Sequence, residues 1–214
     1  MKSNCENIVI VSPHPDDAFI SSAGFVIKNI DKFNFTIVCI TSKDIKPSSE
    51  IRIKEEKEAW SRISDQIDVI FFDKGTDTRL GSSQKEIIAF IEDIVSRLSP
   101  KIVFIPYYLD THQDHRTVSE SCLAACRYMS NILFYETPST FNFYPTMYVK
   151  MEEHVINKKL ECASSYSSQV LGVNEVYSIT LPELIKSQAL GNGAKSRVCK
   201  FAEGFSSHKY FLDY

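Results

Sequence analysis

Short, nearly continuous apolar runs alternate along the first two-thirds of the chain with longer segments in which apolar residues recur every three or four positions. The short runs are rich in β-branched and aromatic residues, as is typical of strands covered on both faces; they span residues 8–12, 35–41, 68–72, 101–107 and 131–136. The longer segments have the spacing of amphipathic helices; they span residues 17–31, 50–64, 83–98 and 117–129. This alternation predicts right-handed βαβ units around a mostly parallel sheet.

The last third of the chain has a less regular pattern. Residues 141–151 are expected to add an edge strand, and residues 152–166 and 181–190 are expected to be helical. We find no internal repeat, no low-complexity tract and no linker long enough to divide the chain. We therefore expect a single α/β domain over residues 1–214, a length that can bury a substantial core.

Composition narrows the class of protein without indicating a reaction. The net charge is −3 with acidic and basic residues interleaved, so we expect no nucleic-acid partner. No segment reaches the roughly 20 apolar residues that span a bilayer, and the apolar run at residues 8–11 is too short for a signal peptide. The six cysteines contain no Cys-x-x-Cys pair. We interpret them as reduced thiols of a soluble cytoplasmic protein.

The first polar motif, Ser12–Asp17, directly follows the first predicted strand and opens the first helix. Two prolines stiffen the turn that carries one imidazole and two adjacent carboxylates. His14 and Asp17 are three residues apart and can converge on one cation, in which case Asp16 would point elsewhere. An Asp-Asp pair at a helix start more often caps the helix. Capping requires neither the histidine nor a second carboxylate, so the complete motif favours a functional site.

The second polar motif, Asp110–His115, follows the fourth predicted strand and contains two histidines and two aspartates within six residues. A polar loop that caps a helix before Arg116 is the alternative interpretation. Ligands of open parallel sheets bind at the carboxyl ends of the strands. Because both motifs lie at this edge, we expect them to face one crevice although nearly a hundred residues separate them.

Together the two motifs contain the groups needed for metal-assisted amide hydrolysis. A catalytic zinc usually has three protein ligands and one water, and His14, Asp17 and His115 offer two nitrogens and one oxygen. Zinc lowers the pKa of its water to about 7. Asp16 could then take the proton of this water and deliver it to the leaving amine.

Attack on an amide carbonyl also creates an oxyanion, which a second donor would stabilise. A protonated His112 could be this donor, with Asp114 or Asp110 holding it charged and oriented. The chain has no Gly-x-Ser-x-Gly motif, which argues against a serine nucleophile.

Several residues outside the two motifs are candidates for substrate binding. Arg52 could contact substrate, or it could be a solvated charge that pairs with Glu55 or Glu56 on its helix. Aspartate and arginine side chains after the third strand could bind sugar hydroxyls, although a turn explains Asp73 equally well. A tyrosine after the fourth strand could stack on a sugar ring. The substrate-binding candidates are Arg52, Asp73, Arg79 and Tyr108.

The motifs resemble those of the PIG-L/LmbE family of zinc-dependent de-N-acetylases. Pro13–Asp17 matches its Pro-His-Pro-Asp-Asp motif, and His112–His115 matches its His-x-Asp-His motif. Three weaker likenesses extend over nearly the whole chain: the family's Arg-x-x-Glu helix, its Tyr-x-Ser-Gln segment and its C-terminal Arg…Ala-Glu-x-Phe resemble Glu50–Glu56, Tyr166–Gln169, and Arg197 with Ala202–Phe205. The resemblance implies a Rossmann-like, three-layer α/β fold with a mostly parallel sheet.

The resemblance also implies roles for individual residues. It implies that His14, Asp17 and His115 bind zinc, that Asp16 is the general base, and that His112 stabilises the oxyanion. Asp114 occupies the position that pairs with this histidine. Two positions depart from the family pattern: Gln113 replaces a frequent proline, and Phe19 stands where a valine or a small acid is common.

The sequence therefore predicts removal of the acetyl group from an N-acetylated amino sugar or a small glycoconjugate, with that small molecule as the partner. Hydrolysis of another acyl amide, such as a formamide, is an alternative in the same pocket. A non-catalytic sugar- or nucleotide-binding protein with a structural metal is the second alternative. A His₂Asp site suits zinc, but iron, cobalt or manganese could be accommodated. The oligomeric state stays open, a homo-oligomer included.

Overall fold

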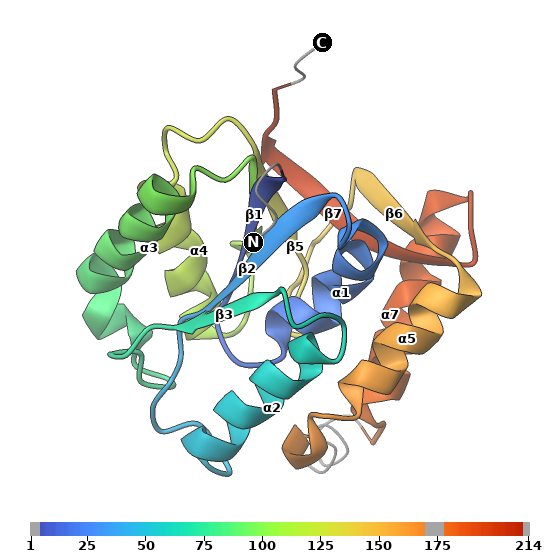
Figure 1. Ribbon diagram of the computed structural model, residues 1–214, viewed down its shortest axis with the longest axis horizontal. Coiled ribbons are helices and arrows are strands. Elements are labelled where there is room, and N and C mark those ends of the chain that lie inside the picture. Colours follow the sequence, from blue (N-terminus) through green and yellow to red (C-terminus); the bar gives the residue numbers. More distant parts are fainter. Residues whose placement is uncertain (1–4, 170–177, 212–214) are drawn as a thin grey trace.

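The computed structural model describes residues 5–169 and 178–211, which form three layers with a sheet between helices (Figure 1). The strands in these residues form one sheet in the order β3-β2-β1-β4-β5-β7-β6. They are β1 (Glu6–Ser12), β2 (Phe33–Cys39), β3 (Asp68–Phe71), β4 (Ile102–Pro106), β5 (Ile132–Tyr135), β6 (Met147–Met151) and β7 (Phe201–Lys209). Strands β1 to β5 pair in parallel, whereas β7 pairs antiparallel with β5 and β6. The expected α/β fold with a mostly parallel sheet is confirmed.

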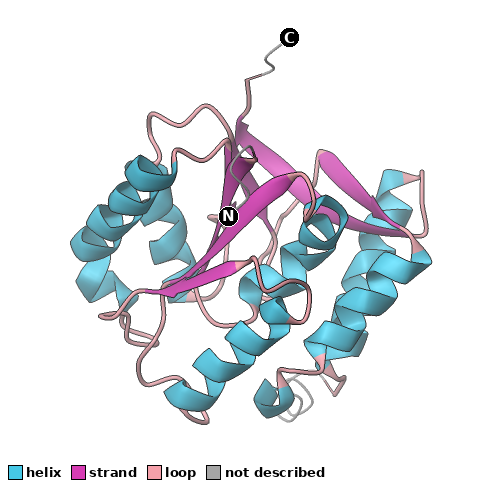
Figure 2. Cartoon of the chain, viewed as in Figure 1, coloured by secondary structure: helices cyan, strands magenta, loops and turns pink. Residues whose placement is uncertain are grey.

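Helices cover both faces of this sheet, and Figure 2 shows them as two groups on either side of the strands. They are α1 (Asp17–Asn29), α2 (Ser49–Ser61), α3 (Gln84–Leu98), α4 (Gln113–Ala125), α5 (Glu153–Ala163) and α7 (Leu181–Ser196), with a 3-10 turn η1 (Leu80–Ser83). Successive residues of a strand point to opposite faces. Ile8 and Ile10 accordingly pack in the core beneath α1, α2, α5 and α7, whereas Val9 and Val11 pack in the core beneath α3 and α4.

Three elements differ from the expectations. Strand β7 was not expected, because its pattern of small and polar residues lacks a continuous apolar run. Helix α4 begins at Gln113 instead of residue 117, since the ring nitrogen of His112 accepts the Asp114 N–H and caps it. Helix α7 continues beyond residue 190 through Gly193, where a side chain would clash with the carbonyl group of Lys200.

A buried ion pair connects strand β7 to helix α5, and its carboxylate also contacts helix α1. Lys159 of α5 and Glu203 of β7 lie 2.6 Å apart, and both are almost fully buried. Glu203 also accepts the backbone N–H groups of Gly24 and Phe25 at 2.6 and 2.7 Å, in the middle of α1. A Cβ atom at Gly24 would lie only 2.8 Å from the Glu203 carboxylate. Glycine at this position therefore allows the carboxylate to reach the helix backbone.

The strand order reverses between β1 and β4, and this reversal locates the crevice. The chain moves outward from β1 to β2 and β3, and then returns to place β4 on the other side of β1. Open α/β sheets bind ligands at such a switch point, outside the carboxyl ends of the strands. Among the described residues, no helix has both the length and the apolarity needed to cross a bilayer.

Candidate active site

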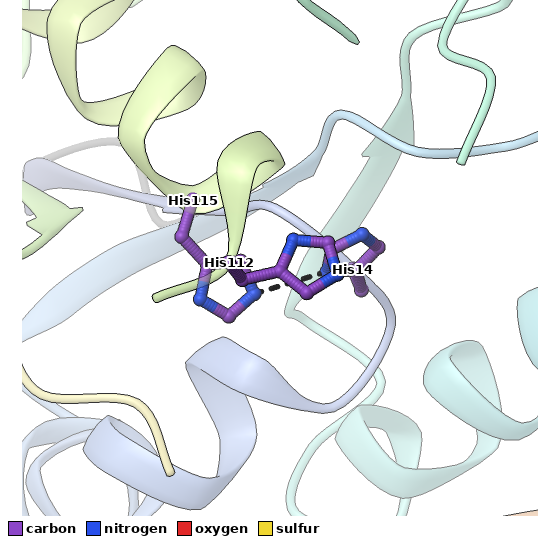
Figure 3. Close-up of side chains that lie close together, drawn as sticks. All are labelled: His14, His112 and His115. Carbon is purple, nitrogen blue, oxygen red and sulfur yellow. Dashed lines mark hydrogen bonds between the residues drawn. The ribbon is translucent and has the colours of Figure 1, made fainter. Parts of the chain in front are cut away.

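The two polar motifs meet at the carboxyl edge of the sheet, at the switch point between β1 and β4. Pro13–Asp17 leads from β1 into α1, and Asp110–His115 leads from β4 into α4. Figure 3 shows the imidazole ring of His14 beside those of His112 and His115, which project from the start of α4. His14 and His115 are 101 residues apart in the sequence, yet their ring nitrogens lie 3.1 Å apart.

The three predicted metal ligands place one atom each at the corners of a small triangle. His14 Nδ1 lies 3.1 Å from His115 Nε2, and Asp17 Oδ2 lies 3.2 Å from each of these nitrogens. Ligand atoms around a tetrahedral zinc with bonds of about 2.0–2.1 Å are ~3.3 Å apart. Two imidazole nitrogens and one carboxylate oxygen with this spacing therefore fit a zinc ion that keeps one position open for water. Their binding of a metal stays a prediction.

Carboxylates behind the two histidines direct the facing nitrogens toward this triangle. His115 Nδ1 lies 3.0 Å from Asp110 Oδ2, and His14 Nε2 lies 3.2 Å from Asp77 Oδ1 and 3.4 Å from Asp114 Oδ2. A carboxylate at the far nitrogen keeps the ring proton there and leaves the near lone pair free for a metal. His14, Asp77 and Asp114 could hold a cation themselves, but their contacts serve equally to orient the His14 ring.

The site concentrates negative charge that a cation would neutralise. Burial lowers the pKa of His115, but the charge of Asp17 and the hydrogen bond to Asp110 outweigh it and raise this pKa to about 9. Burial also opposes protonation of His14, yet its hydrogen bonds with Asp114 and Asp17 raise its pKa well above the usual value. Only neutral imidazole binds a metal, so a divalent ion that enters here must displace these protons.

Exchange of Asp110 for asparagine is expected to lower the affinity for zinc by about 10- to 100-fold. The Asp110 carboxylate accepts hydrogen bonds from the hydroxyl groups of Ser139 and Thr137, both at 2.6 Å, in addition to contacting His115. An amide would polarise the imidazole less and would turn an NH₂ group toward one of these hydroxyls. Competition titration against a chromophoric chelator measures the affinity, with exposed Asp65→Asn as the matched control. Equal affinities of both variants would contradict this role.

Asp16 stands at the start of α1 but does not cap it. Its side chain makes no capping hydrogen bond, and it lines the cavity that also contains the ligand triangle. Burial raises the pKa of the Asp16 carboxyl to about 6, against the lowering effect of the Arg52 charge. Such a carboxylate is ionised at neutral pH and is basic enough to accept a proton from water. The interpretation of Asp16 as a simple helix cap is therefore wrong.

Arg52 is buried, not solvated, with only 3% of its surface exposed. Its Nη2 donates to the Pro15 carbonyl and lies 3.0 Å from Asp16 Oδ2, while Nη1 lies 3.7 Å from Glu55 Oε2. The alternative of a solvated surface charge is thus wrong. Arg52 lines the cavity, and its Nε and Nη1 have no hydrogen-bond partner among the described residues. Both atoms are buried beneath the surface of the cavity wall.

His112 and Asp114 make different contacts from those expected. His112 Nδ1 accepts the backbone N–H of Asp114 at 3.2 Å, which places the ring proton on Nε2. Burial lowers the pKa of His112, so the ring is a neutral donor. The Asp114 carboxylate instead accepts the backbone N–H groups of Thr78 and Leu80, at 2.6 and 3.2 Å. Asp114 therefore fixes the tautomer of His112 through its backbone and orients His14 through its carboxylate.

A cavity of about 390 Å³ opens over the ligand triangle. This volume lies in the range of small-molecule sites, roughly 300–1,000 Å³. The wall combines the polar residues above with apolar and amide side chains; it consists of His14, Asp16, Asp17, Ile20, Ile45, Lys46, Arg52, Asp77, His112, His115, Pro138, Ser139, Gln169 and Leu184. Of the predicted site residues, Asp114 is absent from this wall, as are three of the four substrate-binding candidates.

Asp73, Arg79 and Tyr108 do not line this cavity. Asp73 is exposed after β3, Arg79 borders a separate pocket of about 310 Å³, and Tyr108 packs against Tyr107 and Phe134. Their roles in substrate binding stay predictions. Asp77, between Asp73 and Arg79 in the sequence, is the residue of this segment that lines the cavity.

Sequence reasoning gave no role to the hydroxyl groups after β5. Thr137, Ser139 and Thr140 all donate to the Asp110 carboxylate, and Ser139 also lines the cavity. The signal was present, because this segment follows a strand at the same edge of the sheet as the two motifs. Hydroxyl side chains at a strand end are common, however, and their function becomes apparent only from their hydrogen bonds with Asp110.

The chain matches the family model for PIG-L, described as GlcNAc-PI de-N-acetylase, over residues 9–126. This is more than half of the chain, and it includes both polar motifs and Arg52. A curated relative from Escherichia coli K12, the uncharacterized deacetylase YaiS, is 26% identical over 170 residues, which cover 76% of this chain and 91% of YaiS.

Solved structures share the fold at lower identity. N,N'-diacetylchitobiose deacetylase from Pyrococcus horikoshii has a TM-score of 0.75 and 20% identity, and the match covers 95% of this chain and 84% of that one. GalB from Pseudomonas putida KT2440, a 4-carboxy-2-hydroxymuconate hydratase, has a TM-score of 0.77 and 17% identity, with 98% of each chain covered. The fold thus accompanies more than one reaction, and the site residues must decide between them.

Proposed function

Because the chain belongs to the PIG-L family, we propose that it is a zinc-dependent amidase that removes the acetyl group from an N-acetylated amino sugar or a small glycoconjugate. The observation that carries this proposal is the triangle formed by His14 Nδ1, Asp17 Oδ2 and His115 Nε2, with the Asp16 carboxylate in the same cavity. A bound zinc would supply an activated water and an electrophile for the amide carbonyl.

In this proposal Asp16 transfers the protons, and His112 donates a hydrogen bond to the carbonyl oxygen. Asp16 accepts the proton of the attacking water, since its pKa of about 6 suits transfer near neutral pH. It returns this proton to the nitrogen of the leaving amine. His112 presents its Nε2–H to the oxygen of the attacked carbonyl, because its Nδ1 is occupied by the Asp114 N–H. Removal of one such donor typically costs about 10²–10³ in rate.

The side of the cavity wall near α2 would bind the substrate. The guanidinium of Arg52 lines the cavity and suits the hydroxyl oxygens of a sugar. Gln169 adds an amide, whereas Ile45 and Leu184 offer apolar contact to a ring face. Deacetylation leaves acetate and a free amine, which becomes a cation in water.

A panel of N-acyl compounds tests the proposal directly. N-acetylglucosamine, its 1-phosphate, N,N'-diacetylchitobiose and matching N-formyl and N-propionyl amides are incubated with the zinc-loaded protein, and the released amine is detected with fluorescamine. Turnover of acetyl amides that a chelator abolishes and zinc restores is the expected result. Preference for formyl amides would favour the alternative acyl group. Equal sugar affinity with and without zinc, and no amine, would favour the non-catalytic binding protein.

A further inference from the structure

Two side chains of α2 form hydrogen bonds with the peptide group between Pro15 and Asp16. Arg52 Nη2 donates to its carbonyl oxygen, which belongs to Pro15. Its N–H, which belongs to Asp16, donates to Glu56 Oε2 at 2.8 Å. Arg52 and Glu56 are four residues apart and therefore lie on one face of the helix. Both polar ends of the peptide group that precedes the proposed base are thus held by one rigid element.

The backbone of Asp16 has an unusual conformation that requires such support. Its φ is 102° and its ψ is −34°, in a left-handed region that residues with a side chain rarely adopt. The Asp16 carbonyl meanwhile accepts the Ile20 N–H at 2.8 Å and begins α1. The orientation of the Pro15–Asp16 peptide group therefore determines where the Asp16 carboxylate points.

Glu56 is itself held in place by two further donors. Trp60 Nε1 donates to Oε1 at 2.8 Å, and the hydroxyl of Tyr166 donates to Oε2 at 2.7 Å. Glu56, Trp60 and Tyr166 are all fully buried, and none of them lines the cavity. Among the described residues, Glu56 has no hydrogen bond or ion pair through which it could act directly on a substrate in the cavity. Its contact with the site runs through the N–H of Asp16.

We propose that Glu56 is a positioning residue for the general base: its buried carboxylate holds Asp16 in the left-handed conformation that turns the Asp16 carboxylate toward the water position. This inference rests on the proposed function of Asp16. It also gives Tyr166, part of the Tyr-x-Ser-Gln segment, a reason for its place, since its hydroxyl fixes the carboxylate of Glu56.

Exchange of Glu56 for glutamine tests this role with little change in volume. One oxygen of the side chain becomes an NH₂ group that must face a donor, either Trp60 Nε1–H or the pair formed by Asp16 N–H and Tyr166 O–H. We expect kcat to fall by about 10- to 100-fold, the effect of a small misplacement of a catalytic group, while KM and zinc affinity stay unchanged. Glu50→Gln on the exposed first turn of α2 is the matched control. An unchanged kcat for Glu56→Gln would overturn the proposal.

A double-mutant cycle separates positioning of Asp16 from a general structural effect. In the background of Asp16→Asn, whose residual activity comes from the remaining groups, adding Glu56→Gln is expected to cause no further loss. A loss by the same factor in both backgrounds would mean that Glu56 does not act through Asp16. If Glu56→Gln does not fold, Tyr166→Phe takes its place in the cycle, with a smaller loss in the same direction.

A crystal structure of zinc-loaded Glu56→Gln gives a readout that is independent of the reaction. We expect Asp16 to leave its positive φ and its carboxylate to turn away from the cavity, with the ligand triangle intact. An unchanged φ of Asp16 would overturn the inference about Glu56. A wild-type protein that hydrolyses no amide would instead refute the proposed function. The crystal structure would still test whether Glu56 sets the backbone conformation of Asp16.

Discussion

Exchange of Asp16 for asparagine is expected to lower kcat by about 10²–10⁴-fold, the usual contribution of a general base. The amide cannot take a proton from water, yet it preserves the size of the side chain and an oxygen for Arg52 Nη2, which lies 3.0 Å away in the wild type. Zinc content should stay unchanged, because Asp16 is not part of the ligand triangle. Steady-state kinetics and elemental analysis of the purified variant measure both quantities.

The control for this exchange is Asp65→Asn, the same chemical change on an exposed residue. It should leave kcat, zinc content and melting temperature as in the wild type. Full activity of Asp16→Asn would remove Asp16 from the role of base. Loss of zinc together with activity would instead make Asp16 a ligand, a result that the 3.1–3.2 Å triangle of the other three residues does not predict.

Exchange of His115 for alanine is expected to lower zinc affinity by more than about 10²-fold, because removal of a ligand costs more than removal of the group behind it. His115 is 4% exposed, and its Nε2 occupies one corner of the triangle. Without the ring, Asp17 and Asp110 lose the partner that separates their charges. We therefore expect a lower melting temperature as well, and amidase activity only at high zinc concentration.

Competition with a chromophoric chelator measures the affinity of this variant. His154→Ala is the matched control, since His154 is an exposed histidine on α5. Wild-type zinc affinity of His115→Ala would place the metal elsewhere, for instance between His14, Asp77 and Asp114, which also lie close enough to hold an ion.

Much of the fold follows from the alternation of strand and helix patterns. The parallel strands contain mostly apolar runs because helices cover both faces of the sheet, and β1 illustrates this by contributing residues to both cores. Strand β7 was not predicted from the sequence because it lacks a continuous apolar run. Its buried residues include Ala202, Glu203 and Gly204, which have low strand propensity, and its place is set by pairing with β5 and β6 and by the contact of Glu203 with α1.

The candidate site was predictable where its residues are adjacent in sequence and follow strands. His14, Asp17 and His115 meet because the order of the sheet places β4 beside β1. The contacts of Asp114 and Glu56 were not predictable in the same way. The Asp114 carboxylate turns to the backbone of residues 78 and 80, and Glu56 reaches a backbone N–H 40 residues away. A sequence motif does not show which atom of a residue makes a contact, nor which part of the chain a distant helix packs against.

The ion pair between Lys159 and Glu203 has a consequence for how the chain can be divided. The segment that carries the ligand triangle, the base and Arg52 ends well before either of these residues. Yet the middle of α1, the helix that Asp17 begins, donates two of its N–H groups to Glu203. A fragment cut after α4 would keep the ligand triangle, Asp16 and Arg52, but it would lose the Glu203 carboxylate that accepts N–H groups of α1. We therefore expect that residues 1–125 do not fold on their own into the arrangement that holds the ligand triangle, because β7 supports the helix that Asp17 begins.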